Sequence, residues 1–182
     1  MSIRIASERD IPAMLNIYAP YVEHTTYSFE YEVPTHQQFL QRFSDHVAQF
    51  PWLVWEEGEK VLGYAYAGAP WERMAYSWCA EVSIYLADEA RGRGIGRQLY
   101  QVLEQILTRQ GYRMVYALIT TENRPSEKFH RAMGYTYRTT FENCGYKMGR
   151  WLGVIWYEKQ LNPLGAPGAL PENWMTCIQN LI

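Results

Sequence analysis

Length, composition and charge narrow the class of protein first. The chain has 182 residues, of which 48% are hydrophobic, so it can form one domain with a sizeable core. Its formal net charge of −2 gives no overall attraction for nucleic acid. The N-terminus carries charges where a signal peptide needs an apolar run, and no segment approaches the ~18 apolar residues of a membrane span.

The cysteines and histidines exclude two further classes. Cys79, Cys144 and Cys177 form no CxxC pair, and their odd number argues against a disulfide framework. A reducing, cytoplasmic setting is therefore expected. His24, His36 and His46 show no metal-ligand spacing with a cysteine or an acidic residue, and no metal site is predicted.

The first half of the chain predicts a strand, two helices and a hairpin. A short strand at "IRIA" precedes a helix that begins near the capping pair Ser7 and Asp10. A second helix begins in "PTHQQFLQRF", where Thr35 caps the backbone and Gln38 reaches back. The segments "WLVWEE" and "VLGYAYAG" flank a Glu-Gly-Glu turn and predict a β-hairpin.

The second half alternates strands with helices. In "WCAEVSIYLAD" strict alternation predicts a strand whose apolar face is opposite Glu81 and Ser83. A helical pattern follows from Ile95 and ends at Gly111. Then come a buried strand at "YRMVYALIT", a short helix in "NRPSEKFHRAMGY", and two strands at "YTYRTTF" and "GVIWYEKQL" around the loop "ENCGYKMGRW".

These elements predict an α/β (α+β) fold with a mixed central sheet covered by helices on both faces. The domain is expected to span 1–161. The remaining segment, 162–182, is a proline- and glycine-rich tail that can form one short helical turn.

A glycine stretch, "EARGRGIGRQ", separates the alternating strand from the long helix. Its spacing is neither the dinucleotide-binding GxGxxG nor the Walker A pattern. What remains is Arg91-x-x-Gly94-x-Gly96 at a helix start, where backbone N–H groups and the helix dipole favour phosphate oxygens. Arg93 and Arg97 add positive charge. The alternative is a plain loop with solvated arginines, but the strongly patterned strand and helix on either side favour the anion site.

With this loop, the sequence resembles the GCN5-related N-acetyltransferase (GNAT) superfamily over about residues 3–161. It is similar in particular to the phosphinothricin and methionine sulfoximine acetyltransferases. The pieces that carry this similarity are "PWLVWEEGEKVLGYAYAG", Trp71 before "RMAYSW", "AEVSIYL", "NRPSEKFHRAMGY" and "GYKMGRWLGV". The resemblance implies a mostly antiparallel central sheet flanked by helices, and acetyl transfer from acetyl-CoA to the α-amino group of a small amino acid or analogue.

The resemblance also implies how acetyl-CoA is held. The glycine loop binds the diphosphate, the backbone of one strand pairs with the pantetheine arm, and a later strand–helix turn adds polar contacts. That turn can equally be ordinary helix capping. The implied cofactor residues are Ile84, Tyr85, Leu86, Arg91, Gly92, Arg93, Gly94, Ile95, Gly96, Arg97, Asn123 and Ser126.

Two residues are candidates for proton transfer. Glu81 is the candidate general base, because partial burial opposite an apolar strand face raises a carboxyl pKa. The alternative is that Glu81 pairs with a core arginine. His130 matches the position where many family members have a tyrosine that protonates the leaving thiolate. A lone helical histidine is as often a packing residue, and both roles stay open.

On the substrate side, Arg73 is the first candidate, because a guanidinium recognises the carboxylate of an amino acid. Where relatives continue "RWLD", this chain has Leu152 and Gly153, which can change the side chains that are accepted. The resemblance further implies a homodimer whose "GYKMGRW" segment closes the site. The implied substrate residues are Arg73, Met74, Tyr76, Glu81, Ser83, Lys147 and Trp151.

Two other functions remain open. One is acetylation of a polyamine or of a protein N-terminus. The other is a non-catalytic acyl-CoA-binding module, which would bind CoA and lose nothing when Glu81 is replaced. The physiological amino acid is not predicted, since one methylene changes binding by only ~1–3 kcal/mol.

Overall fold

The computed structural model describes residues 2–182 and contains a seven-stranded sheet in the order β1-β2-β3-β4-β5-β7-β6. Every neighbouring pair is antiparallel except β4 with β5. The strands are β1 (Ser2–Ile5), β2 (Trp52–Glu57), β3 (Lys60–Gly68), β4 (Cys79–Leu86), β5 (Met114–Thr120), β6 (Thr136–Lys147) and β7 (Arg150–Gln160). The helices are α1 (Ile11–His24), α2 (His36–Val47), α3 (Ile95–Gln110), α4 (Arg124–Ala132) and α5 (Trp174–Cys177), with 3₁₀ turns η1 (Glu8–Asp10), η2 (Met74–Tyr76) and η3 (Asp88–Ala90).

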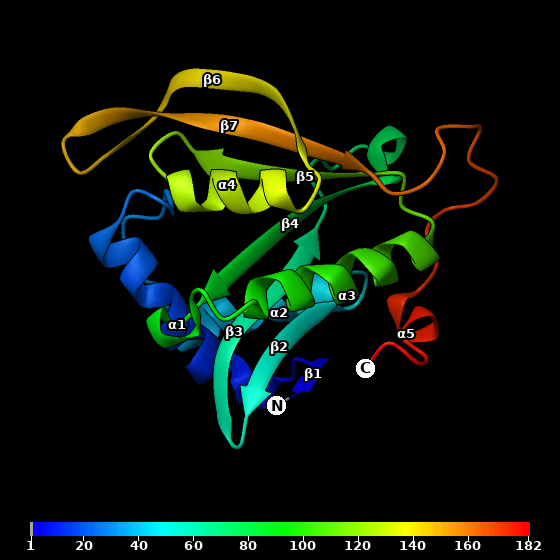
Figure 1. The fold of residues 1–182 in the computed structure, drawn as a ribbon, viewed down its shortest axis with the longest axis horizontal. Helices are drawn as coiled ribbons and strands as arrows, with labels where there is room; N and C mark the ends of the chain where they lie inside the picture. The colour runs from blue at the N-terminus through cyan, green and yellow to red at the C-terminus, as the bar shows by residue number, and fades with distance from the viewer. Residues whose placement is uncertain (1) are drawn as a thin grey trace.

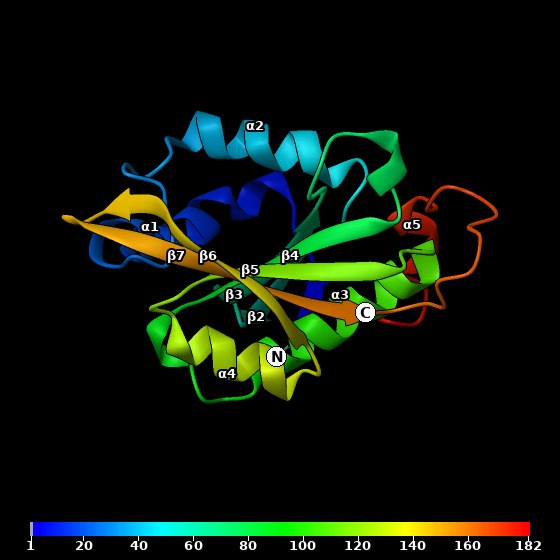
Figure 2. The same cartoon turned by 90° about the horizontal axis from the view of Figure 1, so that it is seen from above.

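Helices cover both faces of the sheet, which confirms the predicted fold class. Figure 2 shows α1 and α2 on one face and α3 and α4 on the other. The first pair packs on side chains of β2 and β3 such as Trp52 and Tyr64. The second layer includes Leu99 and Leu103 of α3, which pack in a larger cluster with Val115 of β5. The central strands are therefore buried on both faces.

The one parallel pair in this sheet separates along its length. Residues Cys79–Glu81 of β4 align with Met114–Tyr116 of β5, and no alignment continues beyond Glu81. Figure 1 shows β4 and β5 diverging along their length, with α4 beside β5 and α3 beside β4. A strand that loses its neighbour leaves backbone N–H and C=O groups that need other partners. The divergence therefore creates a gap in the middle of the sheet.

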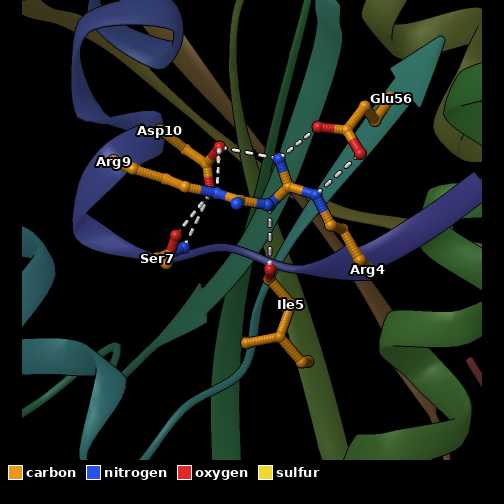
Figure 3. A network of polar contacts seen from close by, with 6 residues as sticks. All are labelled: Arg4, Ile5, Ser7, Arg9, Asp10 and Glu56. Atoms are coloured by element: carbon orange, nitrogen blue, oxygen red, sulfur yellow. Dashed lines mark hydrogen bonds and ion pairs between the residues drawn. The ribbon is translucent and has the colours of Figure 1, made fainter. Parts of the chain in front are cut away.

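An ionic network fixes the start of α1 against the sheet (Figure 3). Arg4 of β1 donates two hydrogen bonds of 2.7 Å to Asp10 and bonds to Glu56 of β2 at 2.6 Å. Asp10 also accepts the Ser7 N–H at 2.8 Å. Burial raises the pKa of Asp10, but the bonds from Arg4 and Ser7 outweigh it, so the pKa is lowered overall. The predicted contact between Ser7 and Asp10 thus belongs to a wider network.

The predicted boundaries of two helices are confirmed. The Thr35 side chain accepts the Gln38 N–H at the start of α2, and the Gln38 side chain accepts the Thr35 N–H at 2.8 Å. Gly94 and Gly111 bound α3, with φ of 78° and 97°. These left-handed conformations favour glycine because it has no Cβ.

The prediction that "ENCGYKMGRW" forms a loop is wrong. Strands β6 and β7 continue through it and form a long hairpin whose turn lies at Met148 and Gly149, both with positive φ. The pairing skips between Phe141 and Gly145, where Asn143 has a φ of 52°. This bulge breaks the alternation of side chains, and the broken alternation made the segment resemble a loop.

The tail after Asn162 folds back onto the domain. Trp174 and Cys177 of α5 are buried in the same hydrophobic cluster as α3. The Trp174 indole donates to the Val47 carbonyl at 2.7 Å. Gln110, at the end of α3, donates to the Glu172 carbonyl at 2.8 Å. The tail therefore joins the ends of α2 and α3 and shares one core with the rest of the chain.

Candidate active site

A cavity of about 320 Å³ lies beside the gap between β4 and β5. Its walls come from the end of β4, the glycine loop, the starts of α3 and α4, and the region of α1. The lining residues are Tyr21, Tyr27, Ile84, Leu86, Arg91, Gly92, Gly96, Asn123, Pro125, Ser126 and Phe129.

The three glycines of the loop meet two different requirements. Gly92 and Gly94 have φ of 73° and 78°, which L side chains rarely adopt. Gly94 is the N-cap of α3 and has no side chain to accept the first N–H groups of the helix. A Cβ on Gly96 would meet Ile84 at 3.3 Å. The loop therefore presents unpaired N–H groups at the positive end of a 16-residue helix, and such a helix start binds anions.

The three arginines of the loop differ in position. Arg91 lines the cavity, and its guanidinium lies 5.4 Å from the centre of the Tyr21 ring. Arg93 is paired with Glu57 at 2.5 Å. Neither Arg93 nor Arg97 lines the cavity. Of the predicted positive charges, Arg91 is therefore the one that the structure brings to the site.

A second helix start lies on the opposite wall. Asn123 is the N-cap of α4, and its side chain accepts the Ser126 N–H at 3.1 Å. Both residues line the cavity, as does Pro125 between them. Asn123 and Ser126 therefore both form the cap of α4 and line the cavity. The starts of α3 and α4, each the positive end of a helix dipole, lie at the same cavity.

The edge of β4 offers backbone groups to the gap from alternate residues. The Ala87 N–H donates to the Leu62 carbonyl at 2.9 Å. Along an antiparallel strand, the backbone N–H and C=O groups of successive residues point alternately to the two sides of the strand. Counting back from Ala87, the N–H and C=O of Tyr85 point toward β3, and those of Ile84 and Leu86 point toward the gap. The expected pairing of the Tyr85 backbone with a pantetheine arm is therefore not supported.

The Leu86 backbone already has a partner. The Tyr21 hydroxyl donates to the Leu86 carbonyl at 2.7 Å and accepts from the Leu86 N–H at 3.2 Å. Of the three strand residues predicted to pair with the pantetheine arm, Ile84 alone keeps gap-facing groups without such a partner in residues 2–182.

Glu81 lies at the closed end of the gap, opposite Tyr116 in the last aligned pair of β4 and β5. Burial raises the pKa of Glu81, and no charged group in the described part of the chain contributes to that shift. The alternative of a core arginine partner therefore has no support. A partly buried carboxylate with a raised pKa is a stronger proton acceptor than a solvated one.

His130 is 3% exposed and does not line the cavity. Its Nδ1–H donates to the Ser126 carbonyl at 2.8 Å, and its Nε2 accepts from the Tyr100 hydroxyl at 3.0 Å in the tautomer that satisfies both partners. Burial lowers the pKa of His130 to about 4, so the ring is neutral at pH 7. This geometry favours the packing role over the acid role.

The substrate-side residues are spread around an aromatic cluster. Arg73 immediately precedes η2, which contains Met74 and Tyr76, all in the connection that leads into β4. Trp71 belongs to the same connection. Its ring centre lies 4.8 Å from that of Tyr76, and its ring stacks on Trp156 of β7 with the centres 5.5 Å apart.

This cluster lies on the Glu81 face of the sheet. Tyr116 aligns with Glu81, and its ring lies 5.4 Å from that of Trp71. Ser83, two residues beyond Glu81, shares this strand face and aligns with Tyr66 of β3. The predicted Ser83 and Tyr76 are therefore near Glu81 or its aromatic neighbours. The residues of β4 that line the cavity, Ile84 and Leu86, belong to the opposite face of the strand.

Lys147 has a different environment from the predicted one. Its ammonium is buried and donates to the carbonyls of Val22, Thr25 and Ser28 at 2.7, 2.9 and 2.7 Å. All three donors of the ammonium are used, so a contact with a substrate carboxylate is not supported. Lys147 instead ties the β6–β7 hairpin to the end of α1. Trp151, in the same hairpin, is 63% exposed.

Sequence reasoning missed several residues of the site. Tyr21 and Tyr27 come from the first helix region, and Tyr116 and Trp156 from later strands. Alternation within β5 and β7 could have placed the last two on one sheet face. No local pattern marks Tyr21, because its partner Leu86 is 65 residues away.

Two further features bear on the kind of site. Within residues 2–182, no group of three or more histidine, cysteine, aspartate or glutamate side chains could hold a metal ion. None of the helices in that range combines the length and the apolar character that crossing a membrane requires.

The model of the acetyltransferase (GNAT) domain family matches residues 3–156. The phosphinothricin N-acetyltransferase of Streptomyces viridochromogenes is 36% identical over 92% of this chain and 91% of its own. The L-methionine sulfoximine/L-methionine sulfone acetyltransferase of Salmonella typhimurium is 31% identical over 93% and 99%. A crystal structure of a phosphinothricin acetyltransferase from Sinorhizobium meliloti in complex with acetyl-CoA has a TM-score of 0.85 at 34% identity, covering 88% of each chain.

The match to this family and the similarity to these enzymes show that the protein is an N-acetyltransferase. Its sheet splits beside a partly buried carboxylate, Glu81. The chain belongs to the acetyltransferase (GNAT) domain family, and the resemblance found in the sequence is confirmed.

Proposed function

We propose that the protein transfers an acetyl group from acetyl-CoA to the α-amino group of a small amino acid or amino-acid analogue. The observation that carries this proposal is Glu81 at the closed end of the gap, three residues along β4 from Ile84 in the wall of a cavity that also contains two helix starts. The relatives named for phosphinothricin and methionine sulfoximine support the class of acceptor.

The residues present fit a CoA thioester. The N–H groups at Gly94 and Gly96 and the Arg91 guanidinium suit the diphosphate oxygens. The open backbone groups of Ile84 suit an amide of the pantetheine arm. Asn123 and Ser126 complete the polar wall. Bound acetyl-CoA supplies an activated acetyl carbonyl and a thiolate leaving group.

The chain's own residues hold the acceptor and move its proton. Glu81 takes a proton from the acceptor ammonium, directly or through one water, which makes the nitrogen a nucleophile. Glu81 and the aromatic cluster lie on one strand face, and Ile84 and Leu86 line the cavity from the other, so acceptor and donor meet at the gap from two faces.

Tyr76 contacts Trp71 of the aromatic cluster. Arg73 and Met74 lie just ahead of Tyr76 in the chain, which supports a role for these residues on the acceptor side.

The Ser126 hydroxyl at the cavity lies 3.3 Å from His130 Nδ1. That nitrogen carries the proton that it donates to the Ser126 carbonyl, so it cannot activate the serine as a base, which favours direct transfer.

We also propose a homodimer. Five large side chains of the β6–β7 hairpin are exposed, and two of them, Tyr146 and Trp151, contact each other with ring centres 5.5 Å apart. Exposed large apolar side chains that contact one another can mark an interaction site. The five are Tyr137, Phe141, Tyr146, Met148 and Trp151. A second copy of the chain is the proposed partner, and light scattering should then give twice the 21.4 kDa of one chain. A mass of one chain at all concentrations would contradict the dimer.

A cytoplasmic location is part of the proposal. It is supported by the three cysteines, which are all free, as expected in a reducing compartment.

The decisive experiment is thiol release from acetyl-CoA by the purified protein with a panel of amines. The panel contains methionine sulfoximine, methionine sulfone, phosphinothricin, tryptophan, glutamate homologues, spermidine and a short peptide. Turnover with one or two amino acids supports the proposal, and turnover with spermidine or the peptide alone supports the other acetyltransferase functions. CoA binding without turnover on any amine would leave the binding module as the better description.

A further inference from the structure

The tail contacts the connection between β3 and β4 as well as the ends of α2 and α3. The Trp78 indole donates a hydrogen bond to the Ala169 carbonyl at 2.8 Å. Trp78 is the last residue before β4, and Tyr76 of η2 stands two positions ahead of it. Figure 1 and Figure 2 both show the tail at the same end of the molecule as this connection. The tail therefore holds the point at which the connection enters the sheet.

The backbone of Trp78 is fixed next to the start of the tail. Its carbonyl accepts the Arg113 N–H at 2.8 Å. The side-chain amide of Asn162, the first residue of the tail, donates to the carbonyl of Tyr112, the neighbour of Arg113, at 2.7 Å. Adjacent residues thus hold Trp78 and the start of the tail, and Ala169 then brings the tail back onto the indole.

The tail is also held beyond Ala169. The Glu172 N–H donates to the Gln110 carbonyl at 2.8 Å, and the side-chain amide of Gln110 donates to the Glu172 carbonyl at 2.8 Å. Two residues further on, Trp174 is buried in the core. The Ala169 carbonyl therefore belongs to a segment that is fixed on both sides, so it can hold the Trp78 indole in place.

The other end of the connection is fixed by Trp71. Its ring stacks on Trp156 of β7 and contacts Tyr116, the residue that aligns with Glu81. Between Trp71 and Trp78 the side chains of Arg73, Met74 and Tyr76 are exposed. Two anchored tryptophans therefore bound the short segment that carries the candidate acceptor-binding residues.

We propose that Trp78 is a positioning residue for the amino-acid acceptor: the tail holds its indole, and this anchor sets where the segment 71–78 presents Arg73 to the acceptor near Glu81. The family model ends at residue 156, so the support comes from a part of the chain beyond that match. This inference rests on the proposed function for its effect on the acceptor, but the anchoring is measurable without turnover.

The first test is kinetic and uses the amino acid that the wild type acetylates best. Trp78→Phe keeps an aromatic ring but loses the donor to Ala169. Its KM for the amino acid should rise by about two- to tenfold, the range that one lost hydrogen bond can give. Its KM for acetyl-CoA should stay within about twofold of the wild type, because other segments line the cavity.

Trp55→Phe is the matched control for this kinetic test. The Trp55 indole also has one acceptor, Glu57 of the same strand, at 3.3 Å. The variant loses an indole hydrogen bond away from the tail, so its KM for the amino acid should be unchanged. An equal rise in this KM in the two variants would overturn the proposal.

The second test is limited cleavage of the folded, full-length protein by trypsin without substrates. Cleavage after the exposed Arg73 reports opening of the segment between the two tryptophans. It should be at least about threefold faster in Trp78→Phe than in the wild type. Cleavage after Lys60, in an exposed position at the start of β3, is the internal reference and should not change.

The two tests separate this inference from the proposed function. If the wild type acetylates no amine but Trp78→Phe speeds cleavage after Arg73 alone, the proposed function fails and the anchoring by the tail stands. If the wild type is active and Trp78→Phe changes neither the KM for the amino acid nor the cleavage after Arg73, the inference fails and the proposed function stands. Equal rises in KM for both substrates would show general damage and would also overturn the role of Trp78.

Discussion

Glu81 and Tyr116 form the last aligned pair of β4 and β5, and the two strands separate immediately after them. The carboxylate therefore lies where the sheet opens, partly buried but reachable from the gap. Because burial raises its pKa, Glu81 is a better proton acceptor than a solvated glutamate. The candidate general base is therefore the residue of β4 at which the gap in the sheet begins.

Replacing Glu81 with glutamine should lower kcat by ~10²–10⁴-fold, the usual contribution of a general base. The side chain keeps its size, so CoA affinity measured by calorimetry should not change. Glu23→Gln, on the exposed surface of α1, is the control and should retain full activity. An unaffected kcat in Glu81→Gln would instead favour the non-catalytic binding module.

The pH dependence of kcat/KM should report the same group. Glu81 must be ionised to accept a proton, and its pKa lies above the ordinary 4.5. Activity should therefore fall with decreasing pH at a midpoint above 4.5, in addition to any ionisation of the acceptor amine. Comparison of two acceptors with different amine pKa values separates the two effects, because the Glu81 midpoint stays constant. A profile that follows only the amine would contradict the assignment.

Gly94→Val should abolish CoA binding without unfolding the protein. A Cβ at Gly94 meets no other atom, but the φ of 78° is strained for valine, at a cost of about 1–3 kcal/mol. If the backbone relaxes, the N–H groups of the loop turn away from the anion. Gly111→Val is the matched control, since Gly111 has a φ of 97° at the far end of the same helix. It should lose similar stability in urea and bind CoA normally, and unchanged CoA affinity in Gly94→Val would refute the role of the loop.

His130 should make the fold sensitive to mild acid. Burial lowers its folded pKa from 6.5 to about 4, so the unfolded chain binds more protons between these values. The stability due to the neutral ring is complete above pH 6.5 and falls as the pH decreases toward 4, by up to about 3 kcal/mol. His130→Gln cannot titrate, so the difference in unfolding free energy between wild type and variant should change over this window. A difference that is constant from pH 7 to pH 4 would show that His130 is not buried as a neutral ring.

The sequence predicted those parts of the site that depend on neighbours along the chain. Alternation placed Glu81 opposite the apolar face of β4, and the glycine spacing marked the start of α3, because both patterns repeat within one element. The contacts of Tyr21 and Lys147 could not be predicted in this way. Tyr21 bonds to a residue 65 positions away, and Lys147 bonds to carbonyls at least 119 positions away. The partners of both side chains are backbone groups, which every residue has, so the sequence pattern cannot identify them.

The hairpin of β6 and β7 shows a different limit. Its bulge near Asn143 interrupts the period of two on which strand prediction depends. Lys147 is nearly fully buried although lysine is usually exposed, and only the end of α1 explains why. The tail was harder still, since its proline and glycine residues are typical of a linker, whereas Trp174 is 4% exposed.

The tail should contribute strongly to stability through that one residue. Trp174→Ala removes a buried indole and its bond to the Val47 carbonyl, and a change of this kind costs about 3–5 kcal/mol. Met175→Ala, on the 56% exposed neighbour, should cost less than about 0.5 kcal/mol. Urea unfolding of both variants measures the two costs. Because the tail contacts the ends of α2 and α3 rather than the cavity, CoA affinity in Trp174→Ala should be retained under conditions where the variant is folded. Similar small losses in the two variants would mean that the tail only rests on the surface and is not part of the core.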